Sequence, residues 1–505
     1  MAARTITLDG AGVAAADIAS VARHGVRVRL CPDGLGRAAA ARAAAEEVAG
    51  RRAVYGRTTG VGANRTQAAA GDDHGVRLLR SHAGGIGAVL PPEQVRAMLA
   101  VRVNQILAGG GGTDPAFAVA MAEALGSGYL PRVHEFGSLG TGDLTALAET
   151  ALTLTGERPW VATPDAHGGP PAAVRPRPGD ALAFCSSGAL TVGQAVLGWD
   201  QIVRSLRAAQ VVAALSLVAV HAGTEPYHEY VHVRRPHPGP AAVAAETRRL
   251  LGDDRPVPVR QDPGGPAPEA RRLLGDDRPV PARVQDPFAH RCHPQVHGAA
   301  VEAADALERT LAVEINAAAE NPLVDASAGT VHHHGGFHLA SLTLALDHLR
   351  LAVLNTAHLS AARLSSLMDP AFTGLRPFLA DGPDGSSGLM VLEYSASSAL
   401  AELRARAYPA SLGHTAVSRG LEEHASFASQ AARQTLDAGR AYRLVLACEL
   451  VTAVRALRGR ALSPATPAGE AFAVAAAVLD PRTGDRPLTE DVETAAGLLG
   501  RLAEI

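Results

Sequence analysis

The segment GSLGTGDL, residues 137–144, places three glycines, a serine, a threonine and an aspartate in eight positions. The apolar run TALAETALTLTGE, residues 145–157, follows it directly. Glycine tolerates positive φ, so this composition favours a tight turn, with Thr141 and Asp143 capping the next helix. Two other interpretations are open: a loop that binds an anion through its amides, and a backbone that is chemically modified by its own residues.

Apolar residues at helical spacing dominate much of the remaining sequence. Residues 92–109 predict one helix, and residues 340–355 and 444–457 each carry an apolar stripe. The stripe residues are Leu342, Leu346, Leu349 and Val353 in the first segment, and Leu444, Ala447, Val451 and Val454 in the second. Because alternating strand patterns are scarce, the sequence predicts a mainly α fold with an elongated central helical bundle.

Glycine and alanine are distributed differently in the two parts of the chain. Residues 1–140 alternate short apolar segments with glycine-rich breaks, and a Pro/Gly-rich stretch follows at 163–180, so we predict an N-terminal domain over residues 1–200. Residues 201–505 are rich in alanine, and we predict a helical bundle domain. The segment RRLLGDDRPVP occurs at 248–258 and again at 271–281, which makes residues 248–287 a 23-residue tandem duplication. We expect it to lie in an exposed loop, where insertions are tolerated.

The composition is that of an ordinary globular protein. Of 505 residues, 47% are hydrophobic and 19% are charged, and the formal net charge is −3. This charge gives no reason to expect nucleic acid or a membrane as a partner. The sequence contains no lysine, which excludes a side-chain Schiff base and an anchor for pyridoxal phosphate. We find no signal-peptide pattern and no uncharged run of membrane-spanning length, and we expect a cytoplasmic protein.

Eight short motifs resemble, in order and rough spacing, those of the histidine and aromatic amino acid ammonia-lyases. They are YGRTTGVG (55–62), SHAGGIG (81–87), GSLGTGDLTALAE (137–149), QDPFAHRCHPQVHG (285–298), AENPLVD (319–325), GGFH (335–338), SSGLM (386–390) and EEHASF (422–427). The resemblance covers nearly the whole chain. It implies an aromatic-lyase-like helical homotetramer whose active sites combine loops of three subunits. It also implies a carbon–nitrogen lyase or aminomutase with a small-molecule substrate, an aromatic or imidazole-bearing amino acid or a related carboxylate.

Enzymes of this family build an electrophile, methylideneimidazolone, from an Ala-Ser-Gly segment of their own backbone. The glycine nitrogen attacks the alanine carbonyl, and loss of two waters leaves a methylidene group that turns the substrate amine into a good leaving group. The aligned residues here are Gly140, Thr141 and Gly142, in a loop one residue shorter than the family's. Dehydration of Thr141 would leave a bulkier, methyl-substituted alkene. We therefore expect no cyclisation and no cofactor, with an unusual electrophile at Thr141 as the alternative.

Four other positions near the electrophile differ from the family's pattern. Ser187 lies in the segment where the family has an asparagine, and Phe288 lies where it has a tyrosine. Gly336 and Leu421 stand where it has an asparagine and a glutamine. Each change removes a polar group that the family places near the substrate, so together they argue against standard ammonia elimination.

Other site positions match the family. Tyr55 corresponds to the catalytic tyrosine, a base when its pKa is depressed, and Arg291 to the arginine that clamps the substrate carboxylate. Glu422 corresponds to an acid that contacts the substrate amine or imidazole. The structural alternatives are a packed turn aromatic, a surface ion pair and a solvated acid. The further predicted substrate-binding residues are His82, Ser187, Gln285, Phe288, Phe337 and His338.

Histidines cluster in HRCHPQVH (290–297) and HHHGGFH (332–338), but neither segment has the spacing of a zinc site. We therefore predict no metal. Three functions stay open at this point. One is a lyase or aminomutase with an electrophile derived from Thr141, and a second is an enzyme without it that catalyses an addition, isomerisation or cyclisation in specialised metabolism. The third is a catalytically silent, ligand-binding homologue.

Overall fold

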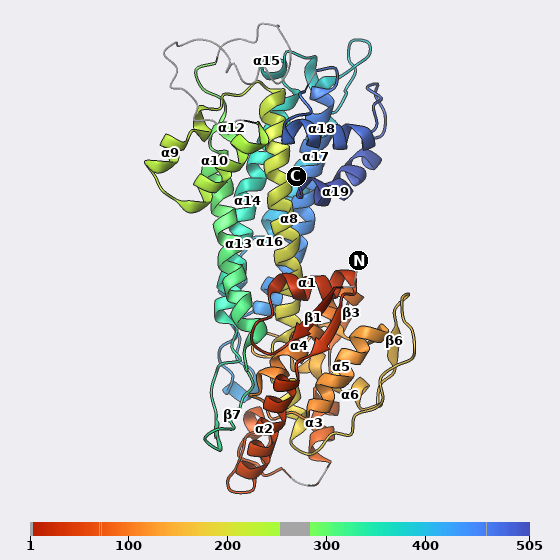
Figure 1. Ribbon diagram of the computed structural model, residues 1–505, viewed down its shortest axis with the longest axis vertical. Coiled ribbons are helices and arrows are strands. Elements are labelled where there is room, and N and C mark those ends of the chain that lie inside the picture. Colours follow the sequence, from red (N-terminus) through yellow and green to blue (C-terminus); the bar gives the residue numbers. More distant parts are fainter. Residues whose placement is uncertain (1–3, 70, 72, 253–282, 461) are drawn as a thin grey trace. The chain divides into compact units, whose positions relative to one another are not determined.

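The computed structural model describes residues 4–69, 71, 73–252, 283–460 and 462–505. Most of them are helical, and each strand has only three or four residues (Figure 1). The predicted mainly α fold class is therefore confirmed. The predicted duplication within residues 248–287 lies largely outside the described residues.

Contacts divide the chain into two compact units. The first unit comprises residues 1–200, 307–347 and 409–436, and the second unit comprises residues 201–306, 348–408 and 437–505. Four long helices have residues in both units: α8 (Ala189–Ala219), α13 (His293–Asn316), α14 (Ala340–Met368) and α17 (Ala428–Leu457).

The first unit holds every strand of the described residues. β1 pairs in parallel with β2, whereas β3 with β5, β4 with β6 and β7 with β8 pair in antiparallel fashion. The strands are β1 (Thr5–Leu8), β2 (Arg27–Leu30), β3 (Ile86–Val89), β4 (Tyr129–Pro131), β5 (His134–Phe136), β6 (Trp160–Ala162), β7 (Leu323–Asp325) and β8 (Thr330–His332). Its other helices are α1 (Ala15–His24), α2 (Pro32–Ala49), α3 (His74–His82), α4 (Pro92–Ala108), α5 (Pro115–Ser127), α6 (Leu144–Leu154) and α7 (Asp180–Cys185).

The helix predicted over residues 92–109 is present as α4, Pro92–Ala108. Proline is suited to the first turn of a helix, because the N–H group that it lacks would have no acceptor within the helix there. Gly109 ends the helix with a φ of 89°, a conformation that favours glycine.

Short helices accompany the four long ones in the second unit. They are α9 (Glu229–Val233), α10 (Pro238–Leu250), α12 (Phe288–Arg291), α15 (Pro370–Thr373), α16 (Val391–Arg406), α18 (Pro467–Val478) and α19 (Thr489–Leu502). A buried ion pair lies among the long helices: Arg363 Nε in α14 is 2.6 Å from Glu449 Oε1 in α17. Glu449 also accepts hydrogen bonds from the hydroxyls of Ser216 in α8 and Ser360 in α14. These bonds satisfy a carboxylate that would otherwise be costly to bury.

The predicted apolar stripes are mostly buried. Leu342, Leu346, Leu349 and Val353 have no exposed area, as predicted for α14. Ala447, Val451 and Val454 are buried in α17, but Leu444 is 44% exposed. The assignment of Leu444 to the buried stripe is therefore wrong, because α17 turns that position towards solvent.

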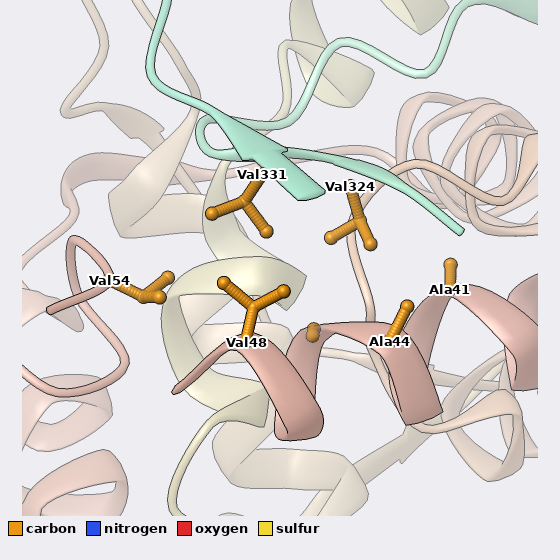
Figure 2. Close-up of a cluster of buried hydrophobic side chains, with 7 residues drawn as sticks. Ala41, Ala44, Val48, Val54, Val324 and Val331 are labelled. Carbon is orange, nitrogen blue, oxygen red and sulfur yellow. The ribbon is translucent and has the colours of Figure 1, made fainter. Parts of the chain in front are cut away.

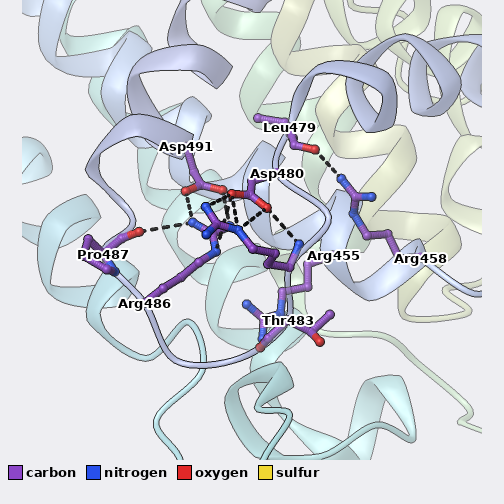
Figure 3. Close-up of polar contacts among 9 residues, drawn as sticks. Arg455, Arg458, Leu479, Asp480, Thr483, Arg486, Pro487 and Asp491 are labelled. Carbon is purple, nitrogen blue, oxygen red and sulfur yellow. Dashed lines mark hydrogen bonds and ion pairs between the residues drawn. The ribbon is translucent and has the colours of Figure 1, made fainter.

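The loop between α18 and α19 is held by arginine–aspartate contacts (Figure 3). Arg482 Nε lies 2.9 Å from Asp480 Oδ2, and Arg486 Nη2 lies 2.7 Å from Asp491 Oδ1. Arg458, directly after α17, donates to main-chain carbonyls at the end of α18. Guanidinium groups here supply the donors that the terminal carbonyls of a helix lack.

A cluster of small apolar side chains packs α2 against the hairpin of β7 and β8 (Figure 2). Its buried members are Ala41, Ala44, Ala45, Val48, Val54, Val324 and Val331. Val54 directly precedes Tyr55, so this packing holds the start of the loop that carries the predicted tyrosine.

One stretch of the described residues, Asp180–Ala219, contains a helix long and apolar enough to cross a membrane by length and composition. The sequence expectation of no such run is therefore corrected. Because 78% of its most apolar window is buried inside the protein, the stretch has the burial of a core helix.

Candidate active site

The segment at 137–144 is a turn built on glycines in the left-handed region. Gly140 has a φ of 79° and Gly142 a φ of 114°, and α6 begins directly afterwards at Leu144. Asp143 occupies the N-cap position of α6 but makes no side-chain capping bond to it. Its carboxylate instead accepts from the N–H and the Oγ1 of Thr191, each at 2.8 Å, in the first turn of α8. The predicted capping of α6 by Asp143 is therefore wrong, since Asp143 caps α8.

The carbonyl oxygen of Gly140 accepts hydrogen bonds from two segments that are distant in sequence. Ser426 Oγ donates to it at 2.7 Å, and the N–H of Leu339 donates at 3.3 Å. The preceding carbonyl, that of Leu139, accepts from the N–H of Phe427 at 2.8 Å. Because buried carbonyls require partners, these bonds fix the turn to the residues before α14 and α17.

Gly140 leaves no room for a side chain. A Cβ at this position would lie 2.2 Å from Ser426 Oγ and 2.5 Å from the main-chain nitrogen of Ala428. Its φ of 79° also disfavours any residue with a Cβ. The observed backbone therefore requires glycine at this position.

Tyr55 is bonded within its own loop. The N–H of Gly62 donates to Tyr55 Oη at 2.7 Å, and the N–H of Tyr55 donates to His333 Nε2 at 3.2 Å. Burial raises the pKa of Tyr55 and the nearby charge of Glu422 adds to the increase, although the bond from Gly62 opposes it. The phenol is therefore protonated at neutral pH in this chain, whereas a tyrosine base needs a depressed pKa.

Glu422 lies next to residues 55–62, here called the Tyr55 loop. Ala63 N–H donates to Ser418 Oγ at 2.9 Å, and a Cβ at Gly62 would lie 3.5 Å from Glu422 Oε1. Val417 and Glu422 exchange main-chain hydrogen bonds. Residues 417–427, here called the 417–427 segment, therefore contact the Tyr55 loop near one end and the Gly140 turn at the other.

His82 and Ser187 have partners among the described residues. His82, at the end of α3, has its Nδ1 2.9 Å from the Leu78 carbonyl oxygen. The buried Ser187 donates its hydroxyl to Gln105 Oε1 at 2.6 Å, and its carbonyl accepts from the N–H of Asp143 at 2.7 Å. These bonds place Ser187 next to the turn at 137–144, and they engage its hydroxyl with Gln105. Substrate binding by Ser187 therefore stays a prediction.

Two residues near the turn were not predicted as site residues. They lie close to two residues that were predicted, the half-buried Phe337 and His338. These two directly precede Leu339, whose N–H donates to the carbonyl oxygen of Gly140. His338 contacts His424 of the 417–427 segment, and the same segment supplies Ser426 to the turn. Both unpredicted residues, His424 and Ser426, lie in the motif EEHASF, which was the signal that could have found them.

The remaining predicted residues belong to the second unit. Arg291 closes α12, and its Cζ lies 4.3 Å from the centroid of the Phe288 ring, which is 64% exposed. Gln285 is exposed just before α12. Among the described residues, the buried Nε of Arg291 has no acceptor. This donor is therefore available to an anion.

Neither histidine cluster forms a metal site. Within the part of the chain that the structure describes, no group of three or more His, Cys, Asp or Glu side chains is arranged to hold a metal ion. His290, His293 and His297 are buried in the second unit. His334 Nε2 lies 2.7 Å from the carbonyl oxygen of Glu320 in the first unit.

The fold and these motifs define an enzyme of the amino acid lyase class, and comparison with known proteins gives the family. The family model for aromatic amino acid lyases matches residues 13–478. Histidine ammonia-lyase of Streptomyces coelicolor is 34% identical over 510 residues, covering 97% of this chain and 96% of that protein. Histidine ammonia-lyase of Geobacillus thermodenitrificans is 32% identical over 468 residues, covering 90% and 88%. The chain therefore belongs to the aromatic amino acid lyase family, whose members are carbon–nitrogen lyases.

Solved structures show the same fold along the whole chain. Histidine ammonia-lyase from Trypanosoma cruzi superposes with a TM-score of 0.85 at 25% identity, covering 99% of this chain and 94% of that one. The ergothioneine degrading enzyme ergothionase from Treponema denticola superposes with a TM-score of 0.86 at 24% identity, covering 99% and 100%. The predicted aromatic-lyase-like fold is thus confirmed.

Proposed function

We propose that this enzyme eliminates a nitrogen group from an amino-acid-derived carboxylate with an aromatic or imidazole ring, and that it does so without methylideneimidazolone. Family membership supports cleavage of a carbon–nitrogen bond. The unpartnered Nε donor of Arg291 supports a carboxylate substrate. The observation that carries the proposal is the composition of the turn, because Thr141 stands where the family has the serine that supplies the methylidene group.

The family's electrophile does not fit residues 140–142. The aligned family residue at position 140 is an alanine, and a Cβ there would overlap Ser426 Oγ. Thr141 replaces the serine from which the methylidene group is made. The carbonyls of Leu139 and Gly140 accept hydrogen bonds from Phe427, Ser426 and Leu339, so both are already engaged by other segments. No step of the proposed reaction is therefore routed through such a group.

Without the electrophile, the substrate must carry a group that leaves unaided. A free ammonium group has N–H protons far more acidic than a C–H bond, so a base removes those first and creates a poor leaving group. A quaternary ammonium group has no N–H proton and leaves as a neutral amine. We therefore propose a betaine, an amino acid with a fully alkylated nitrogen, as the substrate class.

Arg291 is the proposed anchor for the substrate carboxylate. A guanidinium presents two parallel N–H donors that match the two carboxylate oxygens. The Phe288 ring lies against the Arg291 guanidinium and limits its orientations. Phe288 lacks the hydroxyl of the family's tyrosine, so the surface beside Arg291 is apolar.

Tyr55 serves in this proposal as a hydrogen-bond donor. Its oxygen already accepts the N–H of Gly62, so the phenol hydrogen is available for a substrate group. Because the pKa of Tyr55 is raised, this hydrogen stays in place at neutral pH. Glu422, next to the Tyr55 loop, supplies the negative charge that favours a cationic nitrogen group.

Turnover of matched substrates tests the proposal. L-Histidine, L-tyrosine and L-phenylalanine are each compared with their Nα-trimethyl derivatives, with formation of the unsaturated acid followed by absorbance. We expect conversion of at least one trimethyl compound and a much lower kcat/KM for its free amino acid. Histidine ammonia-lyase of Streptomyces coelicolor is the control for the free amino acid. Efficient release of ammonia from a free amino acid would contradict the proposed substrate class.

We also propose that the enzyme is a homotetramer with shared active sites. Large apolar side chains are exposed on α13, α14 and α16 of the single chain, and a subunit interface would cover them. They are Val313 in α13, Leu344 and Leu351 in α14, and Val391 and Tyr394 in α16. Size-exclusion chromatography with light scattering checks this assembly, and a monomer at micromolar concentration would contradict it.

A further inference from the structure

Two histidines from segments far apart in the sequence contact each other near the Gly140 turn. His338 Nε2 lies 3.0 Å from His424 Nδ1, and the ring centroids are 5.1 Å apart. His338 lies just before α14, and His424 belongs to the 417–427 segment. At this N···N distance one ring donates its proton and the other accepts it, so the tautomers of the two rings are coupled.

Each of these histidines is close in sequence to a residue that bonds the Gly140 carbonyl. Leu339, which follows His338, donates its N–H to Gly140 at 3.3 Å. Ser426, which shortly follows His424, donates its hydroxyl to the same oxygen at 2.7 Å. The bonds that hold the turn therefore also hold the two histidines beside it.

The neighbouring histidines are held by main-chain groups instead. His334 bonds a carbonyl through Nε2 and a backbone N–H through Nδ1. His333 Nε2 accepts the N–H of Tyr55. Among the described residues, the Nε2 atoms of His338 and His424 differ: that of His338 contacts only the other imidazole, and that of His424 has no partner. The direct contact between two imidazoles distinguishes this pair from its neighbours, and His338 also bonds its own main chain.

The charge state of His338 suits proton uptake. Burial, and next the proximity of His424, lower the pKa of its imidazole, so this ring is neutral at neutral pH. Burial raises the pKa of the Tyr55 phenol, which makes the phenol a hydrogen-bond donor at neutral pH.

We propose that His338 and His424 form the proton-accepting pair of this active site. The inference rests on the proposed function and names the base of that reaction. One ring nitrogen takes the proton from the substrate carbon next to the aromatic or imidazole ring. The electron pair of that C–H bond becomes the new C=C bond, and the electron pair of the C–N bond leaves with the amine. The pair then releases its proton to water.

Histidine substitutions test the pair with Nα-trimethyl-L-histidine as the probe. His338→Gln and His424→Gln remove the imidazoles, and His332→Gln, an exposed residue of β8, is the matched control. We expect kcat to fall about 100-fold or more in each pair variant, with KM near the wild-type value. His332→Gln should keep the wild-type kcat. Added imidazole should restore part of the kcat of His338→Ala, which a purely structural role would not allow.

Each outcome decides between the two proposals. A wild-type kcat in His338→Gln, or no rescue of His338→Ala by imidazole, overturns the histidine pair while the proposed function stands. Failure of the wild-type enzyme to convert the probe and every other trimethyl compound overturns the proposed function and the pair together. Thermal melting of the variants shows whether they fold, and the rescue by imidazole is read only on variants that melt like the wild type.

Discussion

The hydroxyl of Ser426 donates a 2.7 Å hydrogen bond to the carbonyl oxygen of Gly140. This bond joins the turn to a segment far along the chain, and it occupies the space in which a side chain at position 140 would stand. The same contact therefore explains two things. It fixes the conformation of the turn, and it requires glycine where the family has alanine.

Gly140→Ala should destabilise the protein strongly. The new Cβ would meet both a hydroxyl and a main-chain nitrogen, and the second cannot move aside by changing rotamer. We expect a loss of about 2–4 kcal/mol in the free energy of unfolding, from strain at positive φ and overpacking together. Chemical denaturation measures this loss.

The control for Gly140→Ala is Gly168→Ala. Gly168 has a similar φ of 74°, and a Cβ there would meet no atom within 4 Å. This variant carries the cost of positive φ alone, about 1 kcal/mol. Equal losses in the two variants would show that the space at Gly140 is not restricted.

The fold was largely predictable because its main signal is local. Leu342, Leu346 and Leu349 recur at helical spacing, and all three are buried in α14. Leu444 was misplaced because α17 is buried on most of its sides, with Val445 and Leu446 fully covered. In such a helix several apolar stripes compete, and spacing alone does not decide which position faces solvent.

The candidate site was predictable in its residues but less so in its contacts. Ser426 and Gly140 are separated by nearly three hundred residues, and no local pattern relates them. The capping role of Asp143 was assigned to the nearest helix, whereas its carboxylate bonds Thr191 of α8. Contacts of this kind depend on tertiary packing, which overrides the local preference of a side chain.

Acid should destabilise the second unit through its buried histidines. Burial, and next the charge of Arg363, lower the pKa of His290 and His297 from 6.5 to about 3. Unfolded histidines bind protons below about pH 6.5, whereas these folded ones do so only near pH 3. The unfolded state therefore gains protons first as the pH falls, and stability is lost between these two values.

His290→Leu should weaken this pH dependence. Both ring nitrogens of His290 lack a partner among the described residues, so an apolar side chain removes a cost at neutral pH as well. Between pH 6.5 and pH 5 the variant should lose about 2 kcal/mol less than the wild type. Denaturant unfolding at pH 7 and pH 5 measures the difference. The exposed His414→Leu is the control, and an identical pH dependence in wild type and His290→Leu would refute the assignment.

Arg291→Lys should weaken substrate binding more than catalysis. Lysine keeps the positive charge but loses the paired N–H donors and the flat contact with Phe288. We expect KM to rise about 10-fold or more with a smaller change in kcat, because the carboxylate is bound equally in ground and transition states. Steady-state kinetics with the active trimethyl compound test this. The exposed Arg309→Lys in α13 should behave as wild type, and an unchanged KM in Arg291→Lys would remove Arg291 from the site.

The central claim is that residues 140–142 remain an ordinary peptide segment in an active enzyme. Intact-mass spectrometry of the purified, catalytically active protein tests it directly. We predict the mass of the unmodified chain, because glycine at position 140 and threonine at position 141 do not provide the family's electrophile. A mass lower by two water molecules, mapped to the peptide containing Thr141, would contradict the account.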